Sequence, residues 1–75
     1  MNRIEKITEW IAGGDLAVAV EVEAIYPPDA PNEPCYRPQT VSWLEHLRRC
    51  AERGDIAELE RAGRVYERRA PVGKS

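Results

Sequence analysis

The chain has 75 residues, of which 43% are hydrophobic and 32% charged, and its formal net charge is −2 at pH 7. A chain of this length forms one small core and has little volume for a deep substrate pocket, so we expect a single domain over 1–75 and no enzymatic activity. No apolar run reaches the ~20 residues that cross a bilayer. The charged residues before Trp10 exclude a signal peptide there, so we expect a cytoplasmic protein without a membrane partner.

Residues 3–12 are predicted to form a short amphipathic helix. Ile4, Ile7 and Ile11 recur at helical spacing, and Trp10 widens their apolar stripe. The glycines at 13 and 14 would end this helix, because glycine readily adopts the left-handed conformation that closes helices.

Residues 16–26 are predicted to form a strand. Val18, Val20 and Val22 alternate with alanine and glutamate, which is the period of a strand with one apolar face.

A proline-rich crossover is predicted over 27–38, where five of the six prolines lie. Proline lacks the backbone donor and fixes φ, so neither a helix nor an interior strand continues through this segment. It serves either as a stiff connector or as a docking segment for an aromatic-lined groove.

Two helices are predicted over 40–53 and 56–62, joined by Gly54 and capped at Asp55. We expect Thr40, or Ser42 with Glu45, to cap the first of them. A last strand is predicted over 64–69, and residues 71–75 are expected to form a flexible tail.

These elements predict an α+β domain in the order helix, strand, proline-rich crossover, helix, helix, strand. The two strands would form an antiparallel sheet packed on the helices, with Arg64 or Arg68 opposite Glu21 or Glu23. Because a two-stranded sheet is marginal and has open edges, we expect a homodimer or pairing with another protein's strand.

The residues that suggest site chemistry are Cys35, His46 and Cys50. His46 and Cys50 are four residues apart on one predicted helix, and zinc prefers such nitrogen and sulfur ligands. A fourth soft ligand is missing, so we predict two free thiols and neither a metal, a cofactor nor a catalytic residue. A metal- or thiol-dependent protein centred on His46 and Cys50 is kept as a second alternative.

The leading hypothesis is a small non-catalytic interaction or regulatory protein that forms a homodimer. It would act as an adaptor, an accessory subunit or the antitoxin-like half of a pair. Partner binding is predicted at the strand edge and in the proline-rich segment, through Val20, Val22, Pro34, Cys35 and Tyr36.

The first alternative is a nucleic-acid-binding regulator. Residues 37–75 carry nine basic and six acidic side chains, a net of +3, whereas residues 1–36 carry two and seven, a net of −5. The predicted basic surface lies on one helix face and in the segment that follows it. It comprises Arg48, Arg49, Arg53, Arg64 and Arg68.

Overall fold

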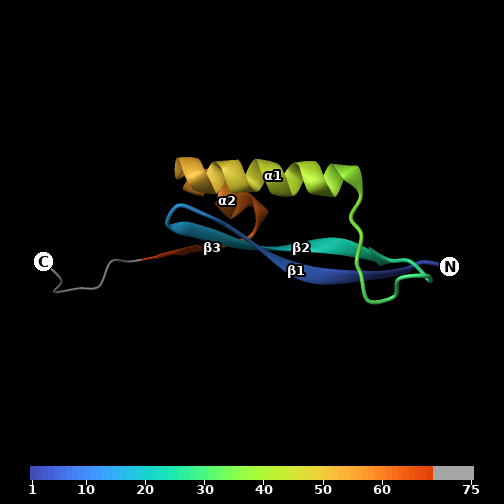
Figure 1. Cartoon of the computed structure of the whole chain (residues 1–75). Helices are drawn as coiled ribbons and strands as arrows, with labels where there is room; N and C mark the ends of the chain where they lie inside the picture. The colour runs from blue at the N-terminus through green and yellow to red at the C-terminus, as the bar shows by residue number, and fades with distance from the viewer. Residues whose placement is uncertain (69–75) are drawn as a thin grey trace, which may run out of the picture.

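The computed structural model describes residues 1–68 and shows a small α+β fold. Its elements, in chain order, are β1 (Arg3–Gly13), β2 (Leu16–Tyr26), α1 (Pro38–Arg53), α2 (Ile56–Ala62) and β3 (Arg64–Glu67). The strands form an antiparallel sheet in the order β1-β2-β3. Both helices cover the same face of this sheet, and no helix within the described part of the chain covers the other (Figure 1). The predicted tail at 71–75 lies outside the described residues.

The predicted helix over 3–12 is wrong, because these residues form β1 and pair along their whole length with β2. The expected helix-first order and two-stranded sheet are wrong for the same reason. Residues 14–15 are a two-residue hairpin turn in which Gly14 has φ 58°. A glycine with positive φ at the first turn position is typical of the type II′ turns that join antiparallel strands.

The sheet has two different faces because side chains alternate along each strand. The face under the helices, called here the inner sheet face, carries the core. The buried residues of that core come from β2, α1 and α2, and Ile7 and Ile11 of β1 pack against them. The members that are most fully buried are Val18, Val20, Leu47, Cys50 and Leu59.

The two helices lie where the sequence predicts them, although α1 begins earlier than expected. α1 starts at Pro38, in the first turn where proline is tolerated, and no side chain caps it. The caps expected at Thr40 or Ser42 are therefore wrong. Gly54 ends α1 with φ 76°, and the Asp55 carboxylate accepts a hydrogen bond from the Glu58 N–H at 3.2 Å, as predicted for the start of α2.

β3 pairs with the first residues of β2 rather than with its acidic stretch. Arg64 lies opposite Ala19, and Glu67 lies opposite Leu16, so the expected pairing of Arg64 or Arg68 with Glu21 or Glu23 is wrong. The reason is the short connection after α2, in which only Gly63 separates the helix from the strand. The end of α2 therefore determines which part of β2 the strand can reach.

The segment between β2 and α1 contains two tight backbone turns, closed by hydrogen bonds from Ala30 to Pro27 and from Glu33 to Ala30. It then returns to the sheet, where Cys35 forms an isolated antiparallel bridge with Ile25. This bridge ties the connection to the end of β2 before the chain enters α1.

Candidate functional site

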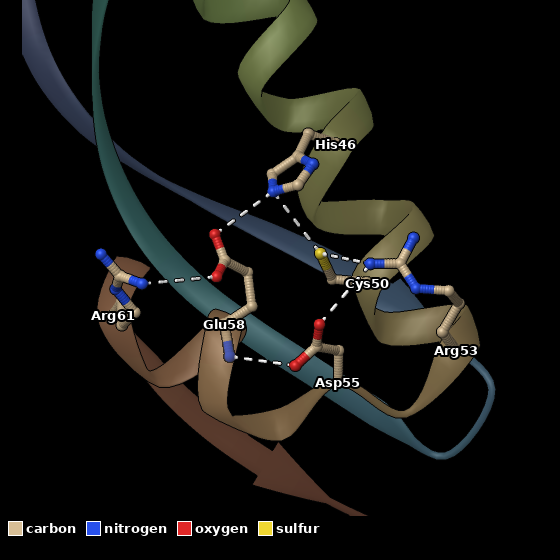
Figure 2. Close-up of polar contacts among 6 residues, drawn as sticks. All are labelled: His46, Cys50, Arg53, Asp55, Glu58 and Arg61. Atoms are coloured by element: carbon tan, nitrogen blue, oxygen red, sulfur yellow. Dashed lines mark hydrogen bonds and ion pairs between the residues drawn. The ribbon is translucent and has the colours of Figure 1, made fainter.

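A group of polar side chains lies where α1 meets α2, as Figure 2 shows. This group, called here the α1–α2 polar cluster, lies around the tight turn at Gly54, which folds α2 back against α1. His46 and Cys50 project from α1 four residues apart, and Glu58 projects from α2. The members of the cluster are His46, Cys50, Arg53, Asp55, Glu58 and Arg61.

The cluster consists of long, weak contacts around one thiol. His46 Nε2 lies 3.4 Å from Glu58 Oε2 and 3.6 Å from Cys50 Sγ. Arg53 lies 3.5 Å from the same sulfur and 3.5 Å from an Asp55 carboxylate oxygen. The ion pairs are largely exposed, and pairs of this kind contribute at most about 1 kcal/mol each.

This geometry differs from that of a nucleophilic triad. In a triad one histidine nitrogen faces the nucleophile while the other is held by the acid. Here the same His46 Nε2 faces both Cys50 and Glu58. Cys50 is also 0% exposed, so no substrate reaches its sulfur without an opening of the fold.

The residues of the expected metal constellation do not meet. Cys35 bridges Ile25 before the start of α1, whereas Cys50 lies near the other end of that helix. The stretch of α1 between Pro38 and Cys50 is about 18 Å long, at 1.5 Å per residue. Within residues 1–68, no group of three or more metal-ligating side chains is close enough to hold an ion.

The expected partner-binding residues lie in two different environments. β2 is the middle strand, but β3 pairs only with its residues Leu16–Ala19, so the strand edge expected near Val20 and Val22 stays a prediction. The side chains of Val20 and Val22 are only 1% and 6% exposed and belong to the core. Pro34 and Cys35 are exposed in the connection before α1.

Tyr36 is partly buried against the core, and its hydroxyl donates a hydrogen bond to Glu9 of β1. That hydrogen bond, together with burial and the Glu9 charge, raises the pKa of Tyr36 to about 12. The contact attaches the connection before α1 to the inner sheet face. Tyr36 therefore contributes to the fold itself.

The expected basic residues do not form one surface. Arg48 pairs with Glu45 at 3.3 Å, and Arg53 belongs to the α1–α2 polar cluster. Arg49 is exposed on the same helix. Arg64, in contrast, shares a sheet face with its register partner Ala19, and the Arg68 N–H bonds Asp15 beside the hairpin turn.

The outer sheet face, which the helices leave open, carries an aromatic pair. Trp10 of β1 and Tyr66 of β3 have ring centroids 5.1 Å apart and are 58% and 44% exposed. Between them β2 contributes only Ala17 and Ala19, the register partners of Tyr66 and Trp10. The predicted helix over 3–12 hid this surface, because it placed Trp10 in a core stripe.

The remaining feature is a long unpaired strand edge. Ile25 exchanges two backbone hydrogen bonds with Cys35, at 2.8 and 2.7 Å, so its backbone groups point away from β1. Ile4 is the register partner of Ile25, so the backbone N–H and C=O of Ile4 also point away from the neighbouring strand, which for Ile4 is β2. Every second residue of β1 from Ile4 to Ala12 therefore presents its N–H and C=O at the edge, and no backbone hydrogen bond within residues 1–68 reaches them.

Comparisons with known proteins do not extend this description. No family model, curated protein or solved structure matches the chain. None of the helices within residues 1–68 is long and apolar enough to cross a membrane.

Proposed function

We propose that the chain is a small non-catalytic interaction protein that binds a protein partner on the outer sheet face. The observation that carries this proposal is the exposed pair of Trp10 and Tyr66 on a sheet face without a helix above it. Burying an aromatic side chain removes a large apolar area from water at a low cost in side-chain entropy, and such residues dominate the energetics of protein interfaces.

The surroundings of the aromatic pair suit a protein partner. Ala17 and Ala19 form a shallow floor that admits an apolar side chain of the partner beside the rings. The polar residues of the same face are of both signs, with Lys6 opposite Glu23 and Arg64 opposite Ala19. A mixed rim of this kind supports specificity without favouring a strongly charged ligand.

This proposal describes an adaptor or accessory subunit, and it includes a cytoplasmic location. Cys35 and Cys50 are free thiols, which is the usual state of cysteine in a reducing compartment. The α1–α2 polar cluster then serves to join the helices, because its sulfur is shielded from solvent.

The test is affinity capture with the tagged chain from its native lysate, after nuclease treatment, compared with a variant that carries both Trp10→Ala and Tyr66→Ala. We expect the partner to be lost at least tenfold while the circular dichroism spectrum is unchanged. Ile4→Ala is the matched control, because Ile4 is 52% exposed on the same face at the opposite end of β1. Equal capture by the double variant would contradict the proposal.

A second candidate function is the binding of single-stranded nucleic acid on the same face. Aromatic side chains on an open antiparallel sheet stack against unpaired bases, and Arg64 and Lys6 are available for phosphate contacts. Glu21 and Glu23 lie on the same face, and their negative charges disfavour nucleic-acid binding.

The two candidates separate in a titration of the free chain with a single-stranded oligonucleotide, observed through tryptophan fluorescence. Nucleic-acid binding predicts quenching that weakens steeply with added salt and disappears in Trp10→Ala. Unchanged fluorescence at low salt leaves the protein-binding proposal alone.

A further inference from the structure

We propose that a second copy of this chain pairs with the β1 edge, antiparallel, about a two-fold axis at Thr8. The proposal concerns the edge of the sheet and goes beyond the partner binding proposed for its outer face. It would join two three-stranded sheets into one continuous sheet. Three observations on β1 and α1 support it.

The first observation is the position of Thr8 within the strand. Thr8 is the midpoint of β1, which runs from Arg3 to Gly13. A two-fold axis there pairs the whole strand with its copy, and the outward backbone groups from Ile4 to Ala12 would form about ten hydrogen bonds. Any shift of the axis leaves part of the edge unpaired.

The second observation is the pattern of charges. With the axis at Thr8, Lys6 lies opposite Trp10 of the second copy, where an ammonium group above an indole ring is favourable. Moving the axis by one residue places Glu5 opposite Glu9, or Glu9 opposite itself. Because like charges directly opposite each other destabilise a strand pair, the charges favour the axis at Thr8.

The third observation is that the helices cover β1 incompletely. The inner residues of β2 are buried, whereas Ile7 and Ile11 on the inner face of β1 are only partly buried. Val41 of α1 is 48% exposed. Val41 precedes Cys50 by nine residues, which is 2.5 turns at 3.6 residues per turn. The two side chains therefore project from opposite sides of α1.

Val41 also lies at the level of the proposed axis. Gly13 is packed against α1, since a Cβ atom there would meet Ala51 Cβ at 3.1 Å. Thr8 precedes Gly13 by about 17 Å of strand, and Val41 precedes Ala51 by about 15 Å of helix. The strand and the helix run in the same direction (Figure 1).

Cys50 contacts His46 on the side of α1 that faces α2. Val41 lies on the side of α1 opposite to Cys50, and it therefore faces away from α2. α2 adjoins β3 in the chain, and β3 lies on the side of β2 opposite to β1. Val41 is therefore on the side of α1 toward the free edge. In the dimer the two Val41 side chains would approach each other above the axis and help to cover Ile7 and Ile11.

Thr8→Pro tests whether the edge holds the dimer. The Thr8 N–H points to the free edge, so proline removes a donor there without removing a hydrogen bond to β2. We expect the unmodified chain to sediment at twice 8.5 kDa at micromolar concentration and Thr8→Pro to sediment at 8.5 kDa with an unchanged circular dichroism spectrum. Thr8→Val, which keeps the N–H, is the matched control and should remain a dimer.

Disulfide cross-linking tests the register independently, even if the proline variant does not fold. In a Cys35→Ser background, Thr8→Cys places two thiols at a directly opposed pair about 5.5 Å apart between Cα atoms, which a disulfide spans. Lys6→Cys places them about 13 Å or more apart. We expect oxidation to link Thr8→Cys and not Lys6→Cys.

Two results would overturn the inference. A monomeric unmodified chain without a Thr8→Cys cross-link would remove the second copy as the occupant of this edge. A cross-link through Lys6→Cys alone would show a different register. Neither result decides whether the outer sheet face binds a partner. Because Trp10 lies opposite Lys6 of the second copy in the proposed dimer, Tyr66→Ala alone tests the proposed function separately, since Tyr66 is on β3, away from the β1 edge.

Discussion

Tyr36 shows how one side chain can look like a binding residue in the sequence and belong to the fold in the structure. Its position among prolines is compatible with a docking segment and with a stiff connector, and its hydroxyl donates a hydrogen bond to Glu9, on a strand 27 residues earlier. Sequence patterns report neighbours along the chain and carry no signal for such a distant pair. The same limit applies to the partner of Trp10, since Tyr66 lies on another strand and beyond both helices.

Replacing Tyr36 with phenylalanine should lower the free energy of unfolding by about 1 kcal/mol at neutral pH, because the hydrogen bond to Glu9 is lost. The pKa of Tyr36 is about 12 in the folded chain, against about 10 in an unfolded chain. The fold therefore favours the neutral phenol. The stabilisation is present in full below pH 10 and is lost as the pH rises through 12.

Urea unfolding of the two proteins across this range gives the measurement. The difference between the unmodified chain and Tyr36→Phe should shrink between pH 10 and 12. A difference that stays constant to pH 12 would mean that the Tyr36 hydroxyl does not titrate as described.

At the scale of whole elements, the sequence predicts the type of four of the five helices and strands, and its prediction for the first element, β1, is wrong. Ile4, Ile7 and Ile11 match a helical stripe, but they are also β-branched, as is Thr8, and such residues favour strands. The spacing of the three isoleucines hides the strand, because in β1 Ile4 lies on the outer sheet face while Ile7 and Ile11 pack against the core. The decisive signal was the two-residue spacer Gly14–Asp15 between two apolar runs, which is typical of a hairpin.

The connection between α2 and β3 requires glycine at position 63, because there is no room for a side chain. A Cβ atom at Gly63 would overlap the carbonyl oxygen of Ala19 and lie 3.1 Å from its carbonyl carbon, and a β2 backbone held in the sheet cannot move aside cheaply. We expect Gly63→Ala to lower the free energy of unfolding by about 3 kcal/mol.

Gly54→Ala is the matched comparison for Gly63→Ala. A Cβ atom there meets nothing within 4 Å, but its φ of 76° makes any other residue strained. The expected loss is about 1 kcal/mol. Urea midpoints of the two variants provide the measurement. A greater loss of unfolding free energy for Gly54→Ala than for Gly63→Ala would contradict the steric role of Gly63.

For the molecule as a whole, one buried cluster joins β2, α1 and α2, and Cys50 lies within it. The valine alternation and the helical stripes predicted most of this cluster, because each depends only on local spacing. The open outer face could not be predicted in the same way. It follows from having three strands and helices on one side only, which is a property of the assembled sheet.

Thiol labelling measures the integrity of this cluster directly. Cys35 is exposed and Cys50 is 0% exposed. A small disulfide reagent should therefore react rapidly with one thiol per chain, and Cys35→Ser should remove that rapid phase. Cys50 should react only as fast as the fold opens, and its rate should rise with urea. Two rapid thiols in the folded chain would contradict the burial of Cys50.

The placement of β3 has a consequence for the order in which the chain folds. β1 and β2 pair through a two-residue turn, whereas Ala19 and Arg64 are 45 residues apart in sequence. Closing the longer loop costs more entropy, so we expect the hairpin to form early and β3 to dock last, after α1 and α2 have formed. Until then Ala17 and Ala19 have an unpaired backbone edge, and Trp10 lacks Tyr66. The aromatic pair on the outer face is thus completed only by the final step of folding.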